Sequence, residues 1–453
     1  MLHKIIDHLN NSDNVAFVIN DVKYNYREVR ELVKKYYYYL ASHPELRLIG
    51  IVMRNDIETY ALLIATFLSN CGYVILNLNN PFERNLVIIN EAKLRVILSS
   101  AESDKSSLPD DICFVSISGL KSVDLDIEFS IPDEDSIAYV LFTSGSTGNP
   151  KGVRISKKNV NAFLRSLDST PISVKDTDSS LQMYDLTFDA SILMLLPTLC
   201  AGGTVYTTIL TKMKLVDIAR VLSIYPISYL FLVPSVIALL KTYVSSISIP
   251  SLRLLLVGGE PVTKTLLDIF KPSVPNASIW NFYGPTEATV GVVIGRIDDI
   301  EEEDLYNDII PIGEPMPGVK HILLDDETIV KEKDIKGELL VGGDQITEGY
   351  VNDESKNREA FYWVDFNGSH ERFYRTGDIV YLDKHGKLSY CGRKDHQVKI
   401  QGYRIELSEI ENLVRTFTGS QAVAFVKEVS GNQQLYLVVE NYEGCEDKIT
   451  KHL

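Results

Sequence analysis

A loop rich in glycine and hydroxyl groups follows an apolar segment in the first third of the chain. Residues 143–152 read TSGSTGNPKG and come directly after the apolar residues 138–142. Glycines let the backbone approach an oxyanion closely, hydroxyls donate hydrogen bonds, and Lys151 adds a positive charge. This pattern predicts a polyphosphate cradle. It is not a Walker A loop, because Pro150 stands where that loop requires its second glycine.

Three more strings carry side chains suited to a nucleotide. Residues 281–290 read NFYGPTEATV, residues 374–380 read YRTGDIV, and residues 392–411 read GRKDHQVKIQGYRIELSEIE. The ring of Tyr283 can stack on a purine, and the Glu287 carboxylate can bind Mg²⁺, a hard cation that prefers oxygen. No convincing Ser/His/Asp set accompanies these strings, and none of the eight histidines is assigned a catalytic role.

Alternating apolar and helical segments must position these strings. The expected strands are residues 48–53, 73–78, 95–98, 138–142, 204–206, 229–232 and 252–257. The expected helices are residues 57–68, 160–167, 191–199, 215–224 and 235–243. Strands separated by helices of this length predict an α/β fold with parallel βαβ sheets.

The last third of the chain has a different pattern. Residues 311–390 hold short apolar runs between Gly, Pro and Asp clusters, which predicts a β-rich subdomain. A small α+β unit follows, with a strand pair at 397–405, strands at 421–426 and 434–439, and a helix whose capping box is Ser408 with Glu411. We therefore expect a large body at 1–392 and a small C-terminal lid domain at 393–453.

The four strings, in this order, resemble the signature motifs of the adenylate-forming superfamily. That superfamily includes acyl-CoA synthetases, luciferases and the adenylation domains of nonribosomal peptide synthetases. The resemblance extends over roughly residues 10 to 445. It implies activation of a carboxylate by ATP, with Mg²⁺, to give an acyl-AMP and pyrophosphate, followed by transfer of the acyl group to a thiol.

The resemblance also implies a role for each matching residue. The catalytic set is Thr143, Lys151, Thr286 and Glu287, and Glu287 is the expected Mg²⁺ ligand. The expected ATP-binding residues are Thr143, Ser144, Gly145, Ser146, Thr147, Gly148, Lys151, Gly258, Gly259, Glu260, Asn281, Tyr283, Gly284, Thr286, Asp378, Tyr390 and Arg393. Asp395 matches the hinge about which the lid rotates, and Lys399 and Gly402 match the face presented during thioester formation.

Residues 188–191 read FDAS and resemble the block with which amino-acid-activating members hold their substrate. A buried Asp189 opposite an ammonium group is a strong charge-assisted pair. Alternatively, Asp189 only caps the helix that follows it. The expected substrate pocket is otherwise uncharged, which predicts a neutral, hydrophobic amino acid. Its residues are Asp189, Ala190, Leu193, Phe231, Leu255, Val257, Phe282, Val290 and Gly291.

The whole-chain composition restricts the function further. The 453 residues include 45 Lys and Arg against 61 Asp and Glu, a net charge of −16, which argues against a nucleic-acid-binding face. The five cysteines are far apart and form no C-x-x-C pair. No signal peptide or membrane-spanning segment is visible. We therefore expect a cytoplasmic enzyme with reduced thiols.

One family motif is missing. Members of the superfamily normally carry a P-x-x-x-N-G-K block near the C-terminus, whose lysine reaches the substrate carboxylate. This sequence has no match, so the lid is expected to be incomplete. Truncation, a lysine from another chain, or binding without turnover would each explain this. Two functions stay open: amino-acid adenylation with delivery to the phosphopantetheine of a carrier protein, or a nucleotide- and amino-acid-binding module. A D-alanyl carrier protein ligase is a neighbouring alternative to the first.

Overall fold

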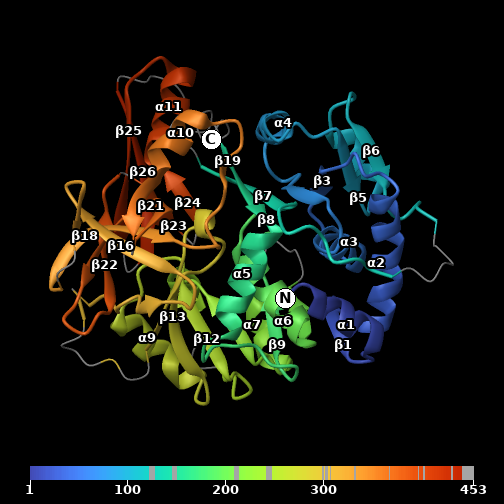
Figure 1. The fold of residues 1–453 in the computed structure, drawn as a ribbon, viewed down its shortest axis with the longest axis horizontal. Helices are drawn as coiled ribbons and strands as arrows, with labels where there is room; N and C mark the ends of the chain where they lie inside the picture. Colours follow the sequence, from blue (N-terminus) through green and yellow to red (C-terminus); the bar gives the residue numbers. More distant parts are fainter. Residues whose placement is uncertain are drawn as a thin grey trace.

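The fold was obtained as a computed structural model, which contains two large sheets, an antiparallel subdomain and a small C-terminal unit (Figure 1). The residues described are 1–121, 128–144, 150–208, 214–240, 247–297, 300, 305–306, 308–330, 333–366, 368–395, 397–400, 403–429 and 432–440.

The first sheet has nine strands and forms the lower part of the molecule in Figure 1. Its strands run in the order β15 (Glu314–Pro315), β14 (Val293–Arg296), β13 (Ser278–Tyr283), β12 (Leu254–Gly258), β11 (Tyr229–Leu232), β9 (Ser179–Gln182), β10 (Thr204–Thr207), β1 (Val15–Ile19) and β2 (Val22–Asn25). From β13 to β1 all neighbours are parallel, and the strands beyond them on both sides are antiparallel.

The second sheet has seven strands. Their order is β19 (Gly349–Tyr350), β8 (Lys151–Ser156), β7 (Ile137–Thr143), β4 (Gly72–Leu76), β3 (Leu48–Val52), β5 (Val96–Ser99) and β6 (Cys113–Ser116). The strands from β7 to β6 are parallel, whereas β8 pairs antiparallel with β7 and β19 pairs antiparallel with β8.

Helices cover both sheets and fill the space between them. They are α1 (His3–Asn11), α2 (Tyr26–Ala41), α3 (Ile57–Phe67), α4 (Phe82–Glu91), α5 (Lys157–Asp168), α6 (Ala190–Ala201), α7 (Lys214–Ile224), α8 (Pro234–Leu240) and α9 (Lys264–Phe270). Every residue of α3 from Thr59 to Phe67 is buried, and so is every residue of α6 from Ser191 to Cys200. The largest core cluster contains residues of both sheets and of both helices, so the main core lies between the sheets.

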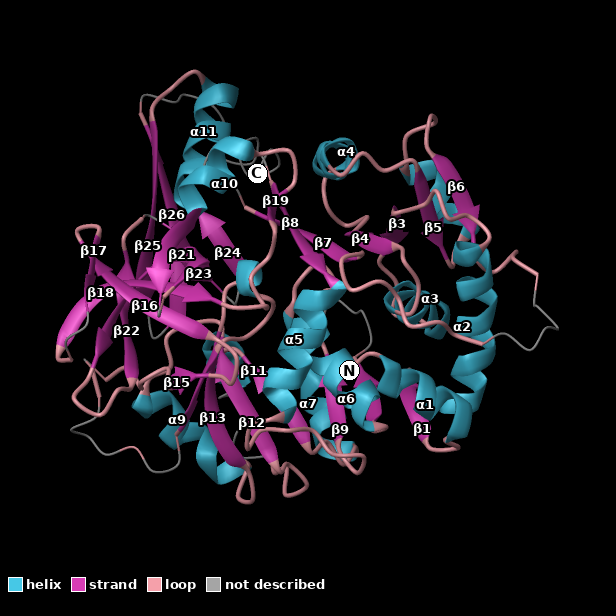
Figure 2. Ribbon diagram, in the orientation of Figure 1, coloured by secondary structure: helices cyan, strands magenta, loops and turns pink. Residues whose placement is uncertain are grey.

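The antiparallel subdomain follows the first sheet. Its strands are β17 (Thr328–Val330), β16 (Lys320–Asp325), β18 (Ile335–Gly342), β21 (Ser369–Leu382), β20 (Phe361–Phe366) and β22 (Leu388–Arg393), with the helix α10 (Glu354–Ala360) before β20. The C-terminal unit holds β23 (Gln397–Ile400), β24 (Tyr403–Glu406), α11 (Leu407–Thr418), β25 (Ala422–Val429) and β26 (Asn432–Val439). We call this unit the lid, and Figure 2 shows its strands and α11 beside the antiparallel subdomain.

The predicted fold class is confirmed, and the main difference lies at one helix start. The seven expected strands and five expected helices all form, and the boundaries differ by a few residues. The predicted capping box was wrong: α11 begins at Leu407, with Glu406 at the N-cap, and the Glu411 carboxylate instead accepts a hydrogen bond from the Ala424 amide at 3.0 Å. The division into two domains at residue 392 stays a prediction. No helix within the described ranges is long and apolar enough to cross a membrane.

Candidate active site

A cavity of about 420 Å³ lies where strands of the first sheet end. Val233 follows β11, Gly259 follows β12 and Gly284 follows β13, and all three line the cavity. Open α/β sheets bind ligands at the carboxyl ends of their strands, because loops there can converge without interrupting the hydrogen bonding of the sheet. The fold therefore places the cavity where a ligand site is expected.

A second cavity of about 320 Å³ adjoins the first. Tyr283, Asn281 and Tyr390 line it, together with Val426 and Gln433 from the lid strands β25 and β26. The two cavities share six lining residues besides Gly259, namely Phe282, Gly284, Asp378, Arg393, Gln397 and Lys399. The predicted nucleotide residues Gly259 and Glu260 also line the second cavity, whereas Gly258 does not. A Cβ atom on Gly258 would lie 1.9 Å from the Phe282 carbonyl oxygen, so this glycine lets β12 and β13 approach.

The predicted phosphate loop connects two antiparallel strands. Thr143 at the end of β7 lies opposite Lys151 at the start of β8, and the predicted Gly145, Ser146, Thr147 and Gly148 fall outside the described residues. The Thr143 hydroxyl is buried and finds no hydrogen-bond partner among the described residues. Such an unsatisfied donor is costly unless a ligand accepts from it. Lys151 is buried close by, and burial lowers its pKa.

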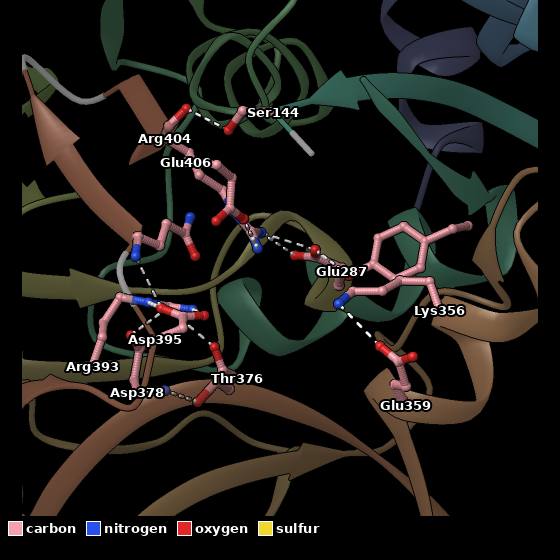
Figure 3. Close-up of polar contacts among 12 residues, drawn as sticks. Ser144, Glu287, Lys356, Glu359, Thr376, Asp378, Arg393, Asp395, Arg404 and Glu406 are labelled. Carbon is pink, nitrogen blue, oxygen red and sulfur yellow. Dashed lines mark hydrogen bonds and ion pairs between the residues drawn. The ribbon is translucent and has the colours of Figure 1, made fainter. Parts of the chain in front are cut away.

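Glu287 lies in a short 3₁₀ turn at Thr286–Ala288 and is completely buried. Its carboxylate accepts hydrogen bonds from Arg404 Nη1, at 2.9 and 3.2 Å to its two oxygens (Figure 3). It also accepts one from the Tyr350 hydroxyl at 2.7 Å. Burial alone would raise the pKa of Glu287, but Arg404 and Tyr350 outweigh it and lower the pKa. The carboxylate is therefore ionised, and as an oxygen donor it fits Mg²⁺.

Asp378 joins the two cavities. The preceding Gly377 has φ +72°, a left-handed conformation that favours glycine. The Asp378 carboxylate accepts hydrogen bonds from the Tyr283 hydroxyl at 2.5 Å and from Arg393 Nη1 at 2.6 Å. Arg393 also binds both oxygens of Asp395, at 2.6 and 2.7 Å. The structure thus brings the expected ribose ligand and the expected hinge residue onto one guanidinium, and the hinge role itself stays a prediction.

Asp189 lines the first cavity at the start of α6. Its side chain makes no standard capping hydrogen bond, but it accepts one from the backbone of Ala190 at the helix start, so the cap role and the substrate role are compatible. Burial raises the pKa of Asp189 to about 6, while a hydrogen bond with Thr286 and the nearby Lys399 act in the opposite direction. A carboxylate so placed can receive an ammonium group.

The predicted substrate residues fall into two groups. Six of them line the first cavity: Asp189, Ala190, Leu193, Phe231, Phe282 and Val290. Leu255 and Val257 do not line it, because alternation along β12 turns both into a separate, fully buried cluster. Gly291 does not line it either. A Cβ atom there would lie 1.9 Å from the Phe282 ring, so Gly291 supports that ring from behind.

Sequence reasoning missed two sets of cavity residues. The apolar end is completed by residues outside the family strings: Met183, Tyr184, Leu215, Ile218, Val236 and Leu239. At the polar end the missed residues are Gln397 and Arg404 of the lid strands, which line the cavity beside Lys399, the residue predicted for the thioester-forming face. Gln397 pairs with Glu406, and Lys399 pairs with Arg404. Because paired residues share a face, these four side chains lie together. The alternation of polar and apolar residues in QVKI and YRIE was the signal that could have revealed this face. The predicted Gly402 lies outside the described residues.

Solved structures share this architecture. A Vibrio cholerae adenylation domain in complex with glycyl-adenosine-5′-phosphate superposes with a TM-score of 0.88 at 25% identity, covering 99% of this chain and 90% of that one. A four-domain nonribosomal peptide synthetase bound to AMP and glycine gives a TM-score of 0.75 at 29% identity, covering 99% and 33%. The two sheets, the antiparallel subdomain and the lid therefore form an adenylation-domain fold.

The sequence comparisons agree. The family model of AMP-binding enzymes matches residues 8–351. One protein of the linear gramicidin synthase of Brevibacillus parabrevis is 32% identical over 439 residues, which cover 94% of this chain and 5% of that protein. The D-alanine--D-alanyl carrier protein ligase of Lactiplantibacillus plantarum is 31% identical over 436 residues, which cover 92% of this chain and 82% of that ligase. The chain belongs to the AMP-binding enzyme family, and the prediction of an AMP-forming ligase is confirmed.

Proposed function

We propose that this chain activates a neutral, apolar amino acid with ATP and transfers it to the phosphopantetheine thiol of a carrier protein in the cytoplasm. The observation that carries the proposal is the position of Asp189. It lies in the cavity whose other end has apolar walls, and Thr286 of the predicted nucleotide site neighbours it. If the α-ammonium group of the substrate pairs with Asp189, the substrate carboxylate would lie near Thr286. The substrate side chain would then lie among the apolar residues.

The residues can be assigned roles in the first half-reaction. A substrate carboxylate oxygen forms a bond to the α-phosphorus of ATP, the bond from that phosphorus to the bridging oxygen breaks, and pyrophosphate leaves. Thr143 and Lys151 are suited to donate to phosphate oxygens, and Asp378 to accept from the ribose hydroxyls. Mg²⁺, held by Glu287 and the phosphates, would offset the negative charge that develops on the phosphate oxygens. No protein nucleophile is needed.

The proposal is tested by exchange of labelled pyrophosphate into ATP with a panel of amino acids, together with calorimetric binding of aminoacyl-sulfamoyl adenosine analogues. Exchange with an apolar amino acid, absent in an Asp189→Ala variant, would support it. Analogue binding that depends on Asp189, without exchange, would replace it with the nucleotide- and amino-acid-binding module. If the chain showed no exchange and bound no analogue, both the enzyme and the binding-module proposals would be overturned.

A second candidate is a D-alanyl carrier protein ligase. The chain is 31% identical to the Lactiplantibacillus plantarum ligase over 436 residues. The aromatic pair Phe231 and Phe282, with ring centroids 6.1 Å apart, forms part of the cavity wall and favours a side chain larger than, or shaped differently from, that of D-alanine. D-alanine in the same exchange panel separates the candidates, since selective exchange with D-alanine would favour the ligase over an enzyme for larger apolar amino acids.

A further inference from the structure

The buried carboxylate of Glu287 requires a positive partner at all times. It is 0% exposed, and an ionised carboxylate removed from water is strongly destabilised unless a cation and hydrogen bonds compensate. Here Arg404 supplies the cation and Tyr350 supplies one hydrogen bond. The proposed function places Mg²⁺ on the same carboxylate. Two different cations are thus assigned to one group.

Arg404 reaches Glu287 only because the lid strands β23 and β24 are inserted into the cavity. The Ser144 hydroxyl donates to the Arg404 carbonyl oxygen at 2.8 Å, which fixes the backbone of β24 at the predicted phosphate loop (Figure 3). Lys399 and Gln397 on the paired strand line the same cavity. Two groups assigned to the nucleotide, Ser144 and Glu287, are therefore bound by a single residue of the lid.

The guanidinium occupies the side of the carboxylate on which a metal ion bound to both oxygens would lie. Arg404 Nη1 lies within 3.2 Å of both carboxylate oxygens, which is the space that an ion at about 2.1 Å from an oxygen would enter. Two cations this close would also repel each other in a water-poor site. We propose that Arg404 replaces the metal ion at Glu287 when the lid strands are inserted, so that Mg²⁺–ATP and the lid compete for this carboxylate.

The hydrogen bonding of Arg404 is incomplete, as expected for a partner of Glu287 that can be replaced. Its Nε–H is buried and has no hydrogen-bond partner among the described residues. Its second contact, from Nη2 to Glu406, spans 3.9 Å and is too long for a hydrogen bond. The pairing satisfies Glu287 fully and Arg404 only in part. When the lid strands leave, the main free-energy cost is therefore that of the unpaired buried carboxylate of Glu287. A metal ion bound to that carboxylate can offset this cost.

The experiment compares wild type with Arg404→Met and Arg404→Lys, and it rests on the proposed function because the probe is Mg²⁺ with the non-hydrolysable analogue α,β-methylene-ATP. The control is Arg415→Met, an exposed arginine of α11 whose Nη1 donates to Asn412 at 3.2 Å. Calorimetry measures the Kd of the Mg²⁺–analogue complex, and hydrogen exchange measures protection of the amides of β23 and β24 without ligand. Circular dichroism verifies that each variant is folded.

We expect Arg404→Met to bind the Mg²⁺–analogue complex at least three-fold more tightly and to lose protection in β23 and β24 at least ten-fold, because nothing then holds the lid on Glu287. Arg404→Lys should lie between this variant and wild type, and Arg415→Met should match wild type. A purely structural role would loosen the lid without tightening binding. Unchanged or weaker binding by Arg404→Met would overturn the inference alone, whereas failure of wild type to bind would overturn the proposed function.

Discussion

The apolar end and the charged end of the site are built in different ways. The apolar end is lined by core residues of the body, such as Leu193 on α6 and Phe231 on β11, whose positions follow from the packing between sheets and helices. The charged end is completed by lid residues that reach across the cavity to the body, as Arg404 does to Glu287. Under the proposed function, a substrate side chain would meet a preformed wall, while the phosphates would meet groups contributed by both the body and the lid.

The largest effect should come from removing the charge of Glu287. Glu287→Gln should lower pyrophosphate exchange by about 10²- to 10³-fold, because the charged end loses its metal-binding carboxylate. The control is Glu354→Gln, whose side chain is 93% exposed. Exchange kinetics with saturating amino acid provide the measurement. A decrease smaller than ten-fold would show that Glu287 does not hold the metal ion.

The next largest effect should be on binding of the amino acid and not on binding of ATP. Asp189→Ala removes the partner of the substrate ammonium, at a cost of about 3 kcal/mol, so the KM for the amino acid should rise roughly a hundred-fold. The KM for ATP should stay within about three-fold of wild type, because the link of Asp189 to the predicted nucleotide site is its hydrogen bond with Thr286. The exposed Asp176→Ala serves as control. Equal increases in both KM values would mean that the two ends of the site are not separable.

The pH dependence should show the same separation. The pKa of Asp189 is raised to about 6, so the carboxyl group is ionised above this pH and protonated below it. The KM for the amino acid should therefore rise as pH falls through 6, by up to about ten-fold per unit. Exchange rates measured from pH 5 to 8 test this. Asp189→Ala should abolish the dependence, and a flat profile for wild type would contradict the pKa shift.

The smallest effect should come from a contact between body and lid that involves Arg84, a residue lining the first cavity. Arg84 on α4 lies 3.7 Å from Glu409 on α11, and its side chain is 39% exposed. The Glu409 side chain is only 10% exposed, but the long contact and the solvent around Arg84 weaken the ion pair, so Arg84→Met should change exchange and lid protection less than about three-fold. Arg358→Met, an exposed arginine, gives the baseline. A loss of exchange as large as that caused by Glu287→Gln would show that the contact between α4 and α11, rather than the charged end, holds the lid in position.

The family strings predicted the residues that local motifs fix. Tyr283 ends β13 and Asp378 follows the irregularity of β21 at Gly377, and both line a cavity. Glu287 lies in the 3₁₀ turn and contacts the cavity residue Arg404. Strand alternation places Phe231 at the cavity and turns Leu255 and Val257 away, and the motif match had not considered which face each strand presents.

Contacts between distant segments could not be predicted in the same way. Arg404 and Glu287 are 117 residues apart, and their pairing depends on where the lid rests against the body. The apolar residues of α7 and α8 likewise reach the cavity only through packing of the first sheet. A local pattern specifies a turn or a face, whereas the partner of that face is set by tertiary packing.

Gly291 has a consequence for how the substrate range of this enzyme can change. It supports the Phe282 ring from outside the cavity, and any side chain there would meet that ring at 1.9 Å. A methyl group at position 291 would force the ring to move, and movement toward the cavity would narrow the space for substrate while every cavity-lining residue kept its identity. A mutation in the supporting layer would then retune selectivity, and an evolutionary comparison restricted to the lining residues would miss its origin.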